Sequence, residues 1–257
     1  DNTATASTLA DHQVRITVTY DSDMKSDFSD LRFTTDDGQT EIDYWIEEYT
    51  ASTSALVWVE VPSITASMMQ DIYMYYGNAA ATTTSNGDNT FLLFDDFNDG
   101  TINGTKWTEV DNLSNEITES SGKLKFTRLS NDAWDKGVIS NTSFTRSDLS
   151  FEVDYRWTLN NSTADALMFG WHDNDSFDPN YTNLVYAYYK AGVGTDDPAD
   201  AFVYEDGTFR SSAGEFATNT DYVVRVRMRA SGGAYYEIST DGGANFSTEY
   251  TSTYSTE

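Results

Sequence analysis

The sequence predicts an all-β protein made of two tandem β-sandwich domains. Apolar and polar residues alternate with a period of two along most of the chain, helical periodicity is nearly absent, and Gly, Asn and Asp separate the alternating runs. Tyr, Thr, Val, Phe and Trp, which favour strands, fill these runs. Short strands separated by such turns are typical of a sandwich or a barrel.

The first expected domain covers residues 1–88 and the second covers residues 89–257. In the first, the run ALVWVEV places Val57, Val59 and Val61 on one face of a strand. The small, polar stretch AAATTTSNGDNT interrupts the alternation and marks the boundary.

The second domain contains at least eight strand-like runs, which is the number that a jelly-roll sandwich needs. They are FLLFDDF, KLKFTRL, LSFEVDYRWTL, ALMFGWHD, NLVYAYYKA, AFVYEDG, YVVRVRMRA and AYYEIST.

The charge balance excludes several classes of partner. Asp and Glu total 42 against 15 Lys and Arg, so the formal net charge is −27. Nucleic-acid binding needs Lys and Arg, and anionic membrane surfaces attract basic segments, so neither partner is expected. No apolar run is long enough to insert into a membrane, and the chain has no cysteine for a disulfide or a thiol nucleophile. The acidity favours solubility in salty water or calcium ligation.

Two parts of the chain resemble known modules. The stretches LADHQVRITVTYDSDM, SDLRFTTDDGQTEIDYWIEEY, ALVWVEVPSI and IYMYYGNAAATT resemble a domain family of unknown function found in large bacterial and archaeal secreted proteins. The stretch FDDFNDGTINGTKW is similar to the opening of the concanavalin A-like, laminin-G-like module. These resemblances imply that the second domain is a concanavalin A-like jelly roll and that the protein is extracellular, as adhesins and polysaccharide-binding proteins are.

The resemblance also implies a strand before Asp1 and a closing strand after Glu257. We expect these strands to be supplied either by trimmed sequence of the same protein or by a neighbouring copy. The N-terminal DNTATAST, which is rich in Thr, is one candidate donor for a neighbour.

The run FEVDYRW raises the question of catalysis, because Glu152 and Asp154 are two apart on a strand. Concanavalin A-like glucanases carry a second Glu soon after such a pair, but Arg156 stands at that position, so a retaining mechanism lacks one of its two carboxyl groups. We therefore expect these three side chains to form a solvent-facing row. The buried row is Phe151, Val153, Tyr155 and Trp157, and the cross-strand partners are Arg225, Arg227 and Arg229. The only histidines, His12 and His172, lack a nucleophile-elbow pattern, so no enzyme is predicted.

Calcium is the one cofactor that the sequence suggests. Asp95 and Asp96 lie in FDDFND, and Asp173, Asp175 and Asp178 lie in HDNDSFDPN. Calcium takes six to eight oxygen ligands from such loops, although neither stretch matches an EF-hand.

Sugar binding requires exposed aromatic rings that stack on a pyranose, with polar neighbours for its hydroxyl groups. The candidate carbohydrate-binding residues are Trp134, Trp171, His172, Tyr181, Tyr186 and Tyr188.

Eight sequons offer candidate glycosylation sites in a secreted protein. They are Asn103, Asn112, Asn141, Asn160, Asn161, Asn174, Asn180 and Asn245.

The stretch STDGGANF, residues 239–246, fits the Asp-box pattern. It predicts a hairpin turn in which Asp241 caps backbone amides, the glycines take positive φ and Phe246 packs beneath.

The function that these observations favour is a non-catalytic extracellular or cell-surface adhesion module, which binds a glycan or acts as a spacer in a larger surface protein. The alternative is a structural subunit of an extracellular filament or pilus that is assembled by strand complementation. The expected partners are a glycan or neighbouring surface-protein subunits, including a homopolymer of this chain.

Overall fold

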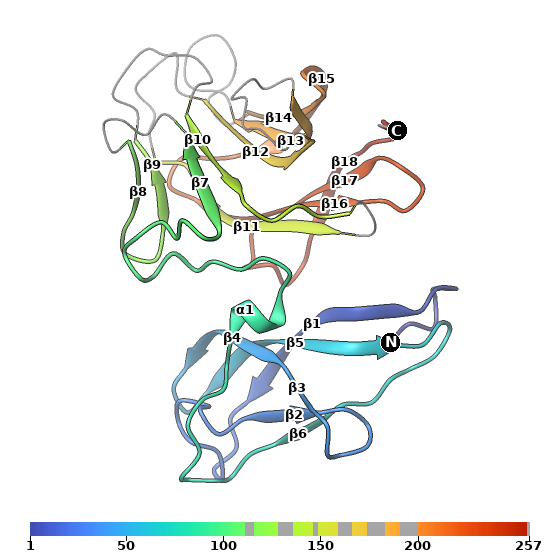
Figure 1. The fold of residues 1–257 in the computed structure, drawn as a ribbon, viewed down its shortest axis with the longest axis vertical. Helices are drawn as coiled ribbons and strands as arrows, with labels where there is room; N and C mark the ends of the chain where they lie inside the picture. The colour runs from blue at the N-terminus through green and yellow to red at the C-terminus, as the bar shows by residue number, and fades with distance from the viewer. Residues whose placement is uncertain are drawn as a thin grey trace. The chain divides into compact units, whose positions relative to one another are not determined.

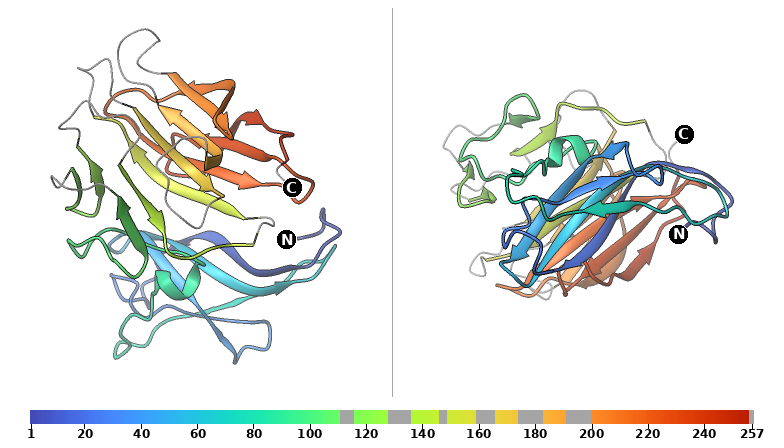
Figure 2. Two further views of the ribbon diagram at one scale, coloured as in Figure 1. Left: turned by 45° about the horizontal axis from the view of Figure 1, so that its top comes forward. Right: turned by 90° about the horizontal axis from the view of Figure 1, so that it is seen from below.

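The chain forms two compact units, Asp1–Asp96 and Phe97–Glu257, each of which is described by itself (Figures 1 and 2). The computed structural model describes residues 1–110, 116–127, 136–145, 149–158, 166–173, 183–190 and 200–255. The prediction of an all-β protein is confirmed, because the one helix among these residues is α1 (Gly87–Thr90). No helix in this part of the chain is long and apolar enough to span a membrane.

The first unit contains two three-stranded antiparallel sheets, with strand orders β1-β5-β4 and β3-β2-β6. Its strands are β1 (Leu9–Thr19), β2 (Arg32–Thr34), β3 (Glu41–Ile42), β4 (Tyr44–Thr50), β5 (Ser54–Ile64) and β6 (Tyr73–Tyr75). The strand β6 lies at the edge of its sheet, so one row of its backbone groups has no neighbouring strand within that sheet.

The period-two pattern of β5 produces its burial. Val57, Val59 and Val61 are buried while the residues between them are half-buried, which confirms the predicted face. β1 pairs with this strand in a register that sets Ile16 opposite Val57. The buried face of β5 belongs to one core cluster, in which Val57 and Val59 pack with Phe28, Leu31, Phe33 and Tyr44. Each such side chain contributes roughly 1.5–3 kcal/mol when fully buried.

The opposite face of the same sheet carries a pair of tryptophans. Trp45 on β4 is the direct cross-strand partner of Trp58 on β5. The ring of Phe91 makes edge contacts with both indoles, at 5.9 Å from Trp45 and 5.5 Å from Trp58. The segment after α1 therefore covers this side of the sheet with aromatic side chains.

The first residues of the chain are attached to their own unit. Asn2 is buried, and its Nδ2 donates hydrogen bonds to the carbonyl oxygens of Ser7 and Ile64 at 2.8 Å and 3.1 Å. The backbone N–H of Ser67 donates to the carbonyl of Thr5 at 2.9 Å. The hypothesis that this segment is free to complete a neighbouring sandwich is therefore not supported, because it already has partners in its own unit.

In the described part of the second unit, the strands form two four-stranded antiparallel sheets, β11-β16-β17-β18 and β12-β13-β14-β15, and two strand pairs, β7–β10 and β8–β9. Its strands are β7 (Trp107–Val110), β8 (Ile117–Glu119), β9 (Leu124–Phe126), β10 (Gly137–Ser140), β11 (Ser150–Arg156), β12 (Leu167–His172), β13 (Leu184–Lys190), β14 (Asp200–Glu205), β15 (Thr208–Glu215), β16 (Asp221–Met228), β17 (Ala234–Ser239) and β18 (Ser247–Thr251).

The two four-stranded sheets form a sandwich whose core contains several tyrosines. The ring of Tyr188 on β13 meets that of Tyr236 on β17 edge to face at 5.3 Å, and Tyr155 on β11 packs 5.1 Å from Phe169 on β12. These rings belong to one core cluster that draws buried residues from both sheets. The finer prediction, a concanavalin A-like jelly roll, stays a prediction.

The pairing of β12 with β13 depends on a glycine. Gly170 lies opposite Ala187 and has a φ of +151°. A Cβ atom at this position would lie 2.1 Å from the carbonyl oxygen of Tyr186, which is far inside van der Waals contact. Only glycine lets the two backbones approach this closely.

Candidate functional site

The strand β11 carries the carboxylate pair that raised the question of catalysis. Glu152, Asp154 and Arg156 are exposed, and the residues between them are partly or fully buried, so the predicted alternation of faces is confirmed. Glu152 lies 3.7 Å from the guanidinium of Arg225, its direct partner on β16. Asp154 lies opposite Val223, so the register sets only one of the two carboxylates directly across from an arginine of β16.

The arginines of β16 have a second acidic partner that the sequence analysis did not identify. Glu237 on β17 lies 2.8 Å from Arg225 and 3.0 Å from Arg227. Burial alone would raise the pKa of Glu237, but the hydrogen bonds from Arg227 and Arg225 outweigh it and hold this pKa below its ordinary value. These ion pairs thus form a network across β11, β16 and β17. Such a network is expected on the polar face of a sheet.

Two of the predicted sugar-binding rings are in the core. Tyr186 and Tyr188 are buried between the sheets, so neither ring presents a face on which a pyranose can stack. Tyr186 also donates its hydroxyl to the carbonyl of Tyr254 at 2.7 Å. The assignment of these two residues to carbohydrate binding is therefore wrong in this structure.

The remaining predicted sugar-binding residues do not form a site among the described residues. Trp171 is half-buried, and its Nε1 donates to the carbonyl of Val226 at 3.0 Å, which fixes the indole on the sandwich. His172 is also half-buried, at the end of β12 opposite Leu184. The predictions for Trp134 and Tyr181 lie outside the described residues.

The acidic residues of the predicted calcium loops do not gather into a group of three within the described ranges. No group of three His, Asp or Glu residues in these ranges has the geometry to hold an ion. Asp95 and Asp96 lie in the first unit and Asp173 lies in the second, while the predictions for Asp175 and Asp178 fall outside the described residues.

Three of the eight sequons lie in the described part of the chain, and their asparagines differ in environment. Asn245 donates its Nδ2 to Asp241 at 2.8 Å, and Asn141 donates its Nδ2 to the carbonyl of Gly104 at 3.0 Å. In Asn103 the Oδ1 accepts from the backbone N–H of Thr105 at 3.0 Å. The sequons that fall outside the described residues are Asn112, Asn160, Asn161, Asn174 and Asn180.

The Asp-box stretch forms the predicted hairpin turn between β17 and β18. The Oδ1 of Asp241 accepts the backbone N–H of Asn245 at 2.9 Å, and Gly242 and Gly243 have φ values of +68° and +78°. The guanidinium of Arg225 lies over the ring of Phe246, with the arginine Cζ atom 3.7 Å from the centre of that ring. The stretch therefore has a structural role in the second unit.

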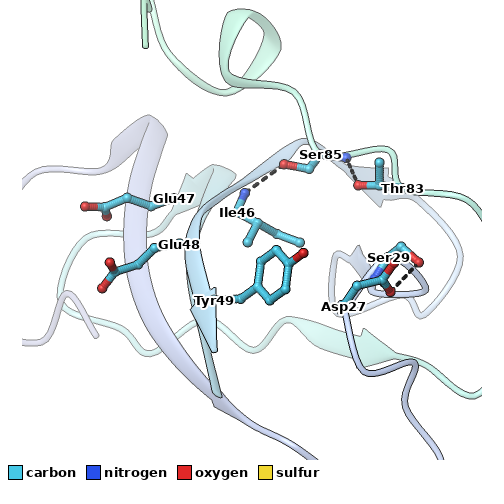
Figure 3. A pocket seen from close by; sticks show the side chains of 8 residues that line it. All are labelled: Asp27, Ser29, Ile46, Glu47, Glu48, Tyr49, Thr83 and Ser85. Carbon is cyan, nitrogen blue, oxygen red and sulfur yellow. Dashed lines mark hydrogen bonds between the residues drawn. The ribbon is translucent and has the colours of Figure 1, made fainter. Parts of the chain in front are cut away.

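An open pocket that the sequence analysis missed lies in the first unit (Figure 3). Its volume is about 450 Å3, within the range of ligand-binding pockets. We call it the Tyr49 pocket. It is lined by Asp27, Ser29, Ile46, Glu47, Glu48, Tyr49, Thr83 and Ser85.

The tyrosine that gives the pocket its name is both exposed and fixed. The Tyr49 side chain, near the end of β4, is 52% exposed. Its ring contacts Phe28 edge to face at 6.2 Å, and Phe28 is fully buried in the core of the unit. One side of the tyrosine is therefore held by a rigid neighbour while much of its ring remains open.

Polar groups surround this ring. Ser85 Oγ accepts the backbone N–H of Ile46 at 2.8 Å, which ties residues 83–85 to β4. Figure 3 shows Asp27 and Ser29 on the far side of the gap from the chain of β4, with the Tyr49 ring extending from β4 into the gap. The pocket thus combines an aromatic surface with hydroxyl groups and a carboxylate.

The acidic residues of the pocket have different roles. The hydrogen bond from the Ser29 hydroxyl to Asp27, 2.7 Å long, and that from the Ser29 backbone N–H lower the pKa of Asp27, so this group is an ionised acceptor at neutral pH. Glu47 accepts the indole N–H of Trp58 at 2.8 Å and lies 3.3 Å from Arg15. Figure 3 shows Glu47 and Glu48 directed away from the Tyr49 ring, so no pair of carboxylates among these lining residues faces across the pocket.

A second, smaller pocket lies in the same unit, with a volume of about 320 Å3. We call it the Tyr75 pocket. It is lined by Asp30, Arg32, Glu41, Tyr75, Tyr76, Asn78 and Ala81. Tyr75 at the end of β6 is 47% exposed, and its hydroxyl donates to the carbonyl of Gly38 at 3.2 Å.

The sequence does contain signals for both pockets. In IEEYT, Tyr49 lies near the end of a strand-like run, and in YMYYGN three tyrosines precede a Gly-Asn turn. Rings at strand ends and beside turns are less often covered by a second sheet than rings in strand centres. The sugar-binding residues predicted from the sequence all lie in the second domain, which contains most of the aromatic residues.

The comparisons with known proteins concern mainly the first unit. Residues 27–110 match the family model of a domain of unknown function, DUF2341, and this match extends from the first unit through β7 of the second. The matched segment includes every residue that lines the two pockets. Neither the comparison with curated proteins nor the comparison with solved structures found a match for the chain. One third of the chain is thus similar to a family whose function is itself undefined, and that segment contains both candidate binding pockets.

Proposed function

We propose that this chain is a non-catalytic module of an extracellular or cell-surface protein and that it binds a glycan in the Tyr49 pocket. The observation that supports this function is the Tyr49 ring, which is exposed on one side, fixed by Phe28 on the other and surrounded by polar groups. A flat ring stacks on the apolar face of a pyranose, while hydroxyl and carboxylate groups bind the sugar hydroxyls.

The polar groups of the pocket suit a neutral ligand. Asp27 accepts hydrogen bonds in its ionised form, and Ser29, Thr83 and Ser85 carry hydroxyl groups that both donate and accept. None of the described residues that line the pocket is Lys, Arg or His, so phosphate or sulfate groups have no cationic partner among them. The net charge of −27 further disfavours polyanionic ligands.

Binding is favoured over cleavage by the arrangement of the carboxylates. Glycoside hydrolysis needs two carboxyl groups on either side of the scissile bond. In the Tyr49 pocket Glu47 is engaged with Trp58 and Arg15, and both Glu47 and Glu48 are directed away from the Tyr49 ring. Asp27 therefore has no opposing acid among the lining residues. On β11, Glu152 is paired with Arg225.

The test is binding of the intact chain to a panel of soluble neutral oligosaccharides, measured by calorimetry. Tyr49→Ala should weaken binding at least about twofold, since a stacked aromatic contact contributes about 0.5–1.5 kcal/mol beyond its buried area. Tyr73→Ala is the matched control, because Tyr73 is 48% exposed but lines neither pocket. Equal effects of the two substitutions, or no binding of any oligosaccharide, would refute the proposal.

The non-catalytic part of the proposal has its own test. Release of reducing ends from β-glucans, galactans and carrageenans should stay at background with the intact chain. Release that disappears in a Glu152→Gln variant would show that the chain is an enzyme.

A further inference from the structure

We infer that the Tyr49 pocket and the Tyr75 pocket are two subsites of one site, which holds a chain of linked sugars rather than a single sugar. This inference rests on the proposed function and specifies its ligand class. It requires that the two pockets adjoin, that the wall between them is rigid and that each has its own ring.

The two pockets share a wall. Ser29 lines the Tyr49 pocket and Asp30, the next residue, lines the Tyr75 pocket. Consecutive Cα atoms are about 3.8 Å apart across a trans peptide bond, so the linings of the two pockets meet at this backbone segment. The same division recurs in a second segment, where Ala81 belongs to the Tyr75 pocket and Thr83 to the Tyr49 pocket.

Side-chain hydrogen bonds fix this wall. Arg32 donates its Nη2 to the carbonyl of Thr82 at 2.8 Å, which joins the two segments directly. Asp30 is buried and accepts the backbone N–H groups of Lys25 at 3.0 Å and of Gly77 at 2.7 Å. Because these bonds form on folding, the wall does not have to be ordered when a ligand binds, which lowers the entropic cost of binding.

Each pocket presents its own aromatic surface. Tyr49 is the ring of one pocket, and Tyr75 and Tyr76, both exposed, are the rings of the other. Both volumes, about 450 Å3 and about 320 Å3, lie in the lower part of the range for ligand pockets, so each suits a short piece of a ligand. The hydrogen-bonding groups differ, because Arg32 lines only the Tyr75 pocket.

A ligand that reaches both pockets gains from the second contact without a second loss of translational freedom. Affinity should therefore rise steeply with chain length until both pockets are filled and then level off. A monosaccharide or disaccharide should occupy the pockets separately.

The test is calorimetry of the intact chain with a length series, from disaccharide to octasaccharide, of each neutral glycan in the panel. We expect one octasaccharide per protein and an affinity at least about tenfold higher than for the disaccharide. Tyr75→Ala should remove most of this gain and lower the number of disaccharides bound per protein from two to one. Tyr75→Phe, which keeps the ring, should retain the gain, and Tyr73→Ala should have no effect.

The outcomes separate this inference from the proposed function. Two octasaccharides per protein, or a gain with length that survives Tyr75→Ala, would show two independent pockets and overturn the inference alone. Tyr49-dependent binding without any dependence on length would do the same. Absence of binding at every length would overturn both the inference and the proposed function.

Discussion

At the scale of single residues, Glu205 carries a carboxylate inside the sandwich of the second unit. Its side chain is fully buried, its Oε1 accepts the hydroxyl of Tyr236 at 3.1 Å, and its Oε2 lies 3.2 Å from Arg210. Burial raises the pKa of Glu205, and the hydrogen bonds from Ser252 and Tyr236 and the charge of Arg210 offset this only in part. A raised pKa in the folded state means that stability is lost as the pH rises through that pKa.

Replacement of Glu205 by Gln should therefore stabilise the protein at neutral pH. The amide oxygen can still accept the Tyr236 hydroxyl, while the cost of burying a charge disappears. We expect a gain on the order of 1 kcal/mol, or about 2–4 °C in the midpoint of thermal unfolding. The gain should vanish in acid, where Glu205 itself is protonated. Glu215→Gln, at an exposed position, is the control. If Glu205→Gln instead lowered the midpoint at neutral pH, the ion pair of Glu205 with Arg210 would contribute more than burial of the charge costs.

The two core tyrosines show which information about single residues the sequence lacks. Alternation places Tyr186 and Tyr188 on one face of β13 and Tyr189 on the other, and this division is correct. Tyr189 packs against Phe202 and Tyr204 on the other face, at 5.8 Å and 5.3 Å. Because both faces of this sheet carry aromatic residues, their pattern does not reveal which face is turned to the other sheet.

At the scale of elements, the β12–β13 pair depends on the close approach at Gly170. Gly170→Ala would place a Cβ atom 2.1 Å from the carbonyl oxygen of Tyr186, at a φ of +151° that L side chains rarely adopt. We expect a loss of roughly 2–4 kcal/mol in the free energy of unfolding, from backbone strain and overpacking together. Denaturant unfolding measures this loss.

A second glycine provides the comparison for that substitution. A Cβ atom added at Gly104 would meet no other described atom within 4 Å, and the φ of this glycine is not positive. Gly104→Ala should therefore leave the free energy of unfolding nearly unchanged. If both substitutions had equal effects, the close approach in β12–β13 would not be the cause of the loss.

The strands could be predicted from the sequence better than the pockets. The faces of β5 and β11 follow from a period of two, because each inward residue must find apolar contacts. The Tyr49 and Tyr75 pockets depend instead on residues 27–32 and 78–85, much of which is turn and irregular structure. In such segments hydrogen bonds such as Arg32 to Thr82, fifty residues apart, set the geometry, and no local pattern encodes them.

At the scale of the whole molecule, the net charge of −27 makes the folded state repel itself. When the ionic strength rises from about 0.01 M to about 0.15 M, the Debye length shrinks from about 30 Å to about 8 Å. We therefore expect the midpoint of thermal unfolding to rise with added NaCl. KCl should act equally if screening is the cause, and a midpoint that falls with either salt would contradict this account.

A specific effect of calcium would appear on top of this screening. If Asp173, Asp175 and Asp178 bind the ion, calcium at a hundred times its dissociation constant should stabilise the fold by ~2.7 kcal/mol. Magnesium at the same ionic strength is the control for screening. An Asp175→Asn variant should lose the calcium effect, and a midpoint unmoved by calcium or by a chelator would contradict the predicted calcium site.

The tryptophan pair on β4 and β5 has an optical consequence. Trp45 and Trp58 are the only tryptophans in residues 1–96, and they lie directly opposite each other on neighbouring strands. The ring of Phe91 contacts both indoles and holds each of them in an asymmetric environment, which gives a near-ultraviolet circular dichroism signal that is lost on unfolding. Glu47, which is one of the residues that line the Tyr49 pocket, accepts the indole N–H of Trp58, so the environment of this indole includes one side chain of the pocket lining. The first unit therefore contains its own spectroscopic probe, and Trp45→Phe identifies which part of the spectrum belongs to it.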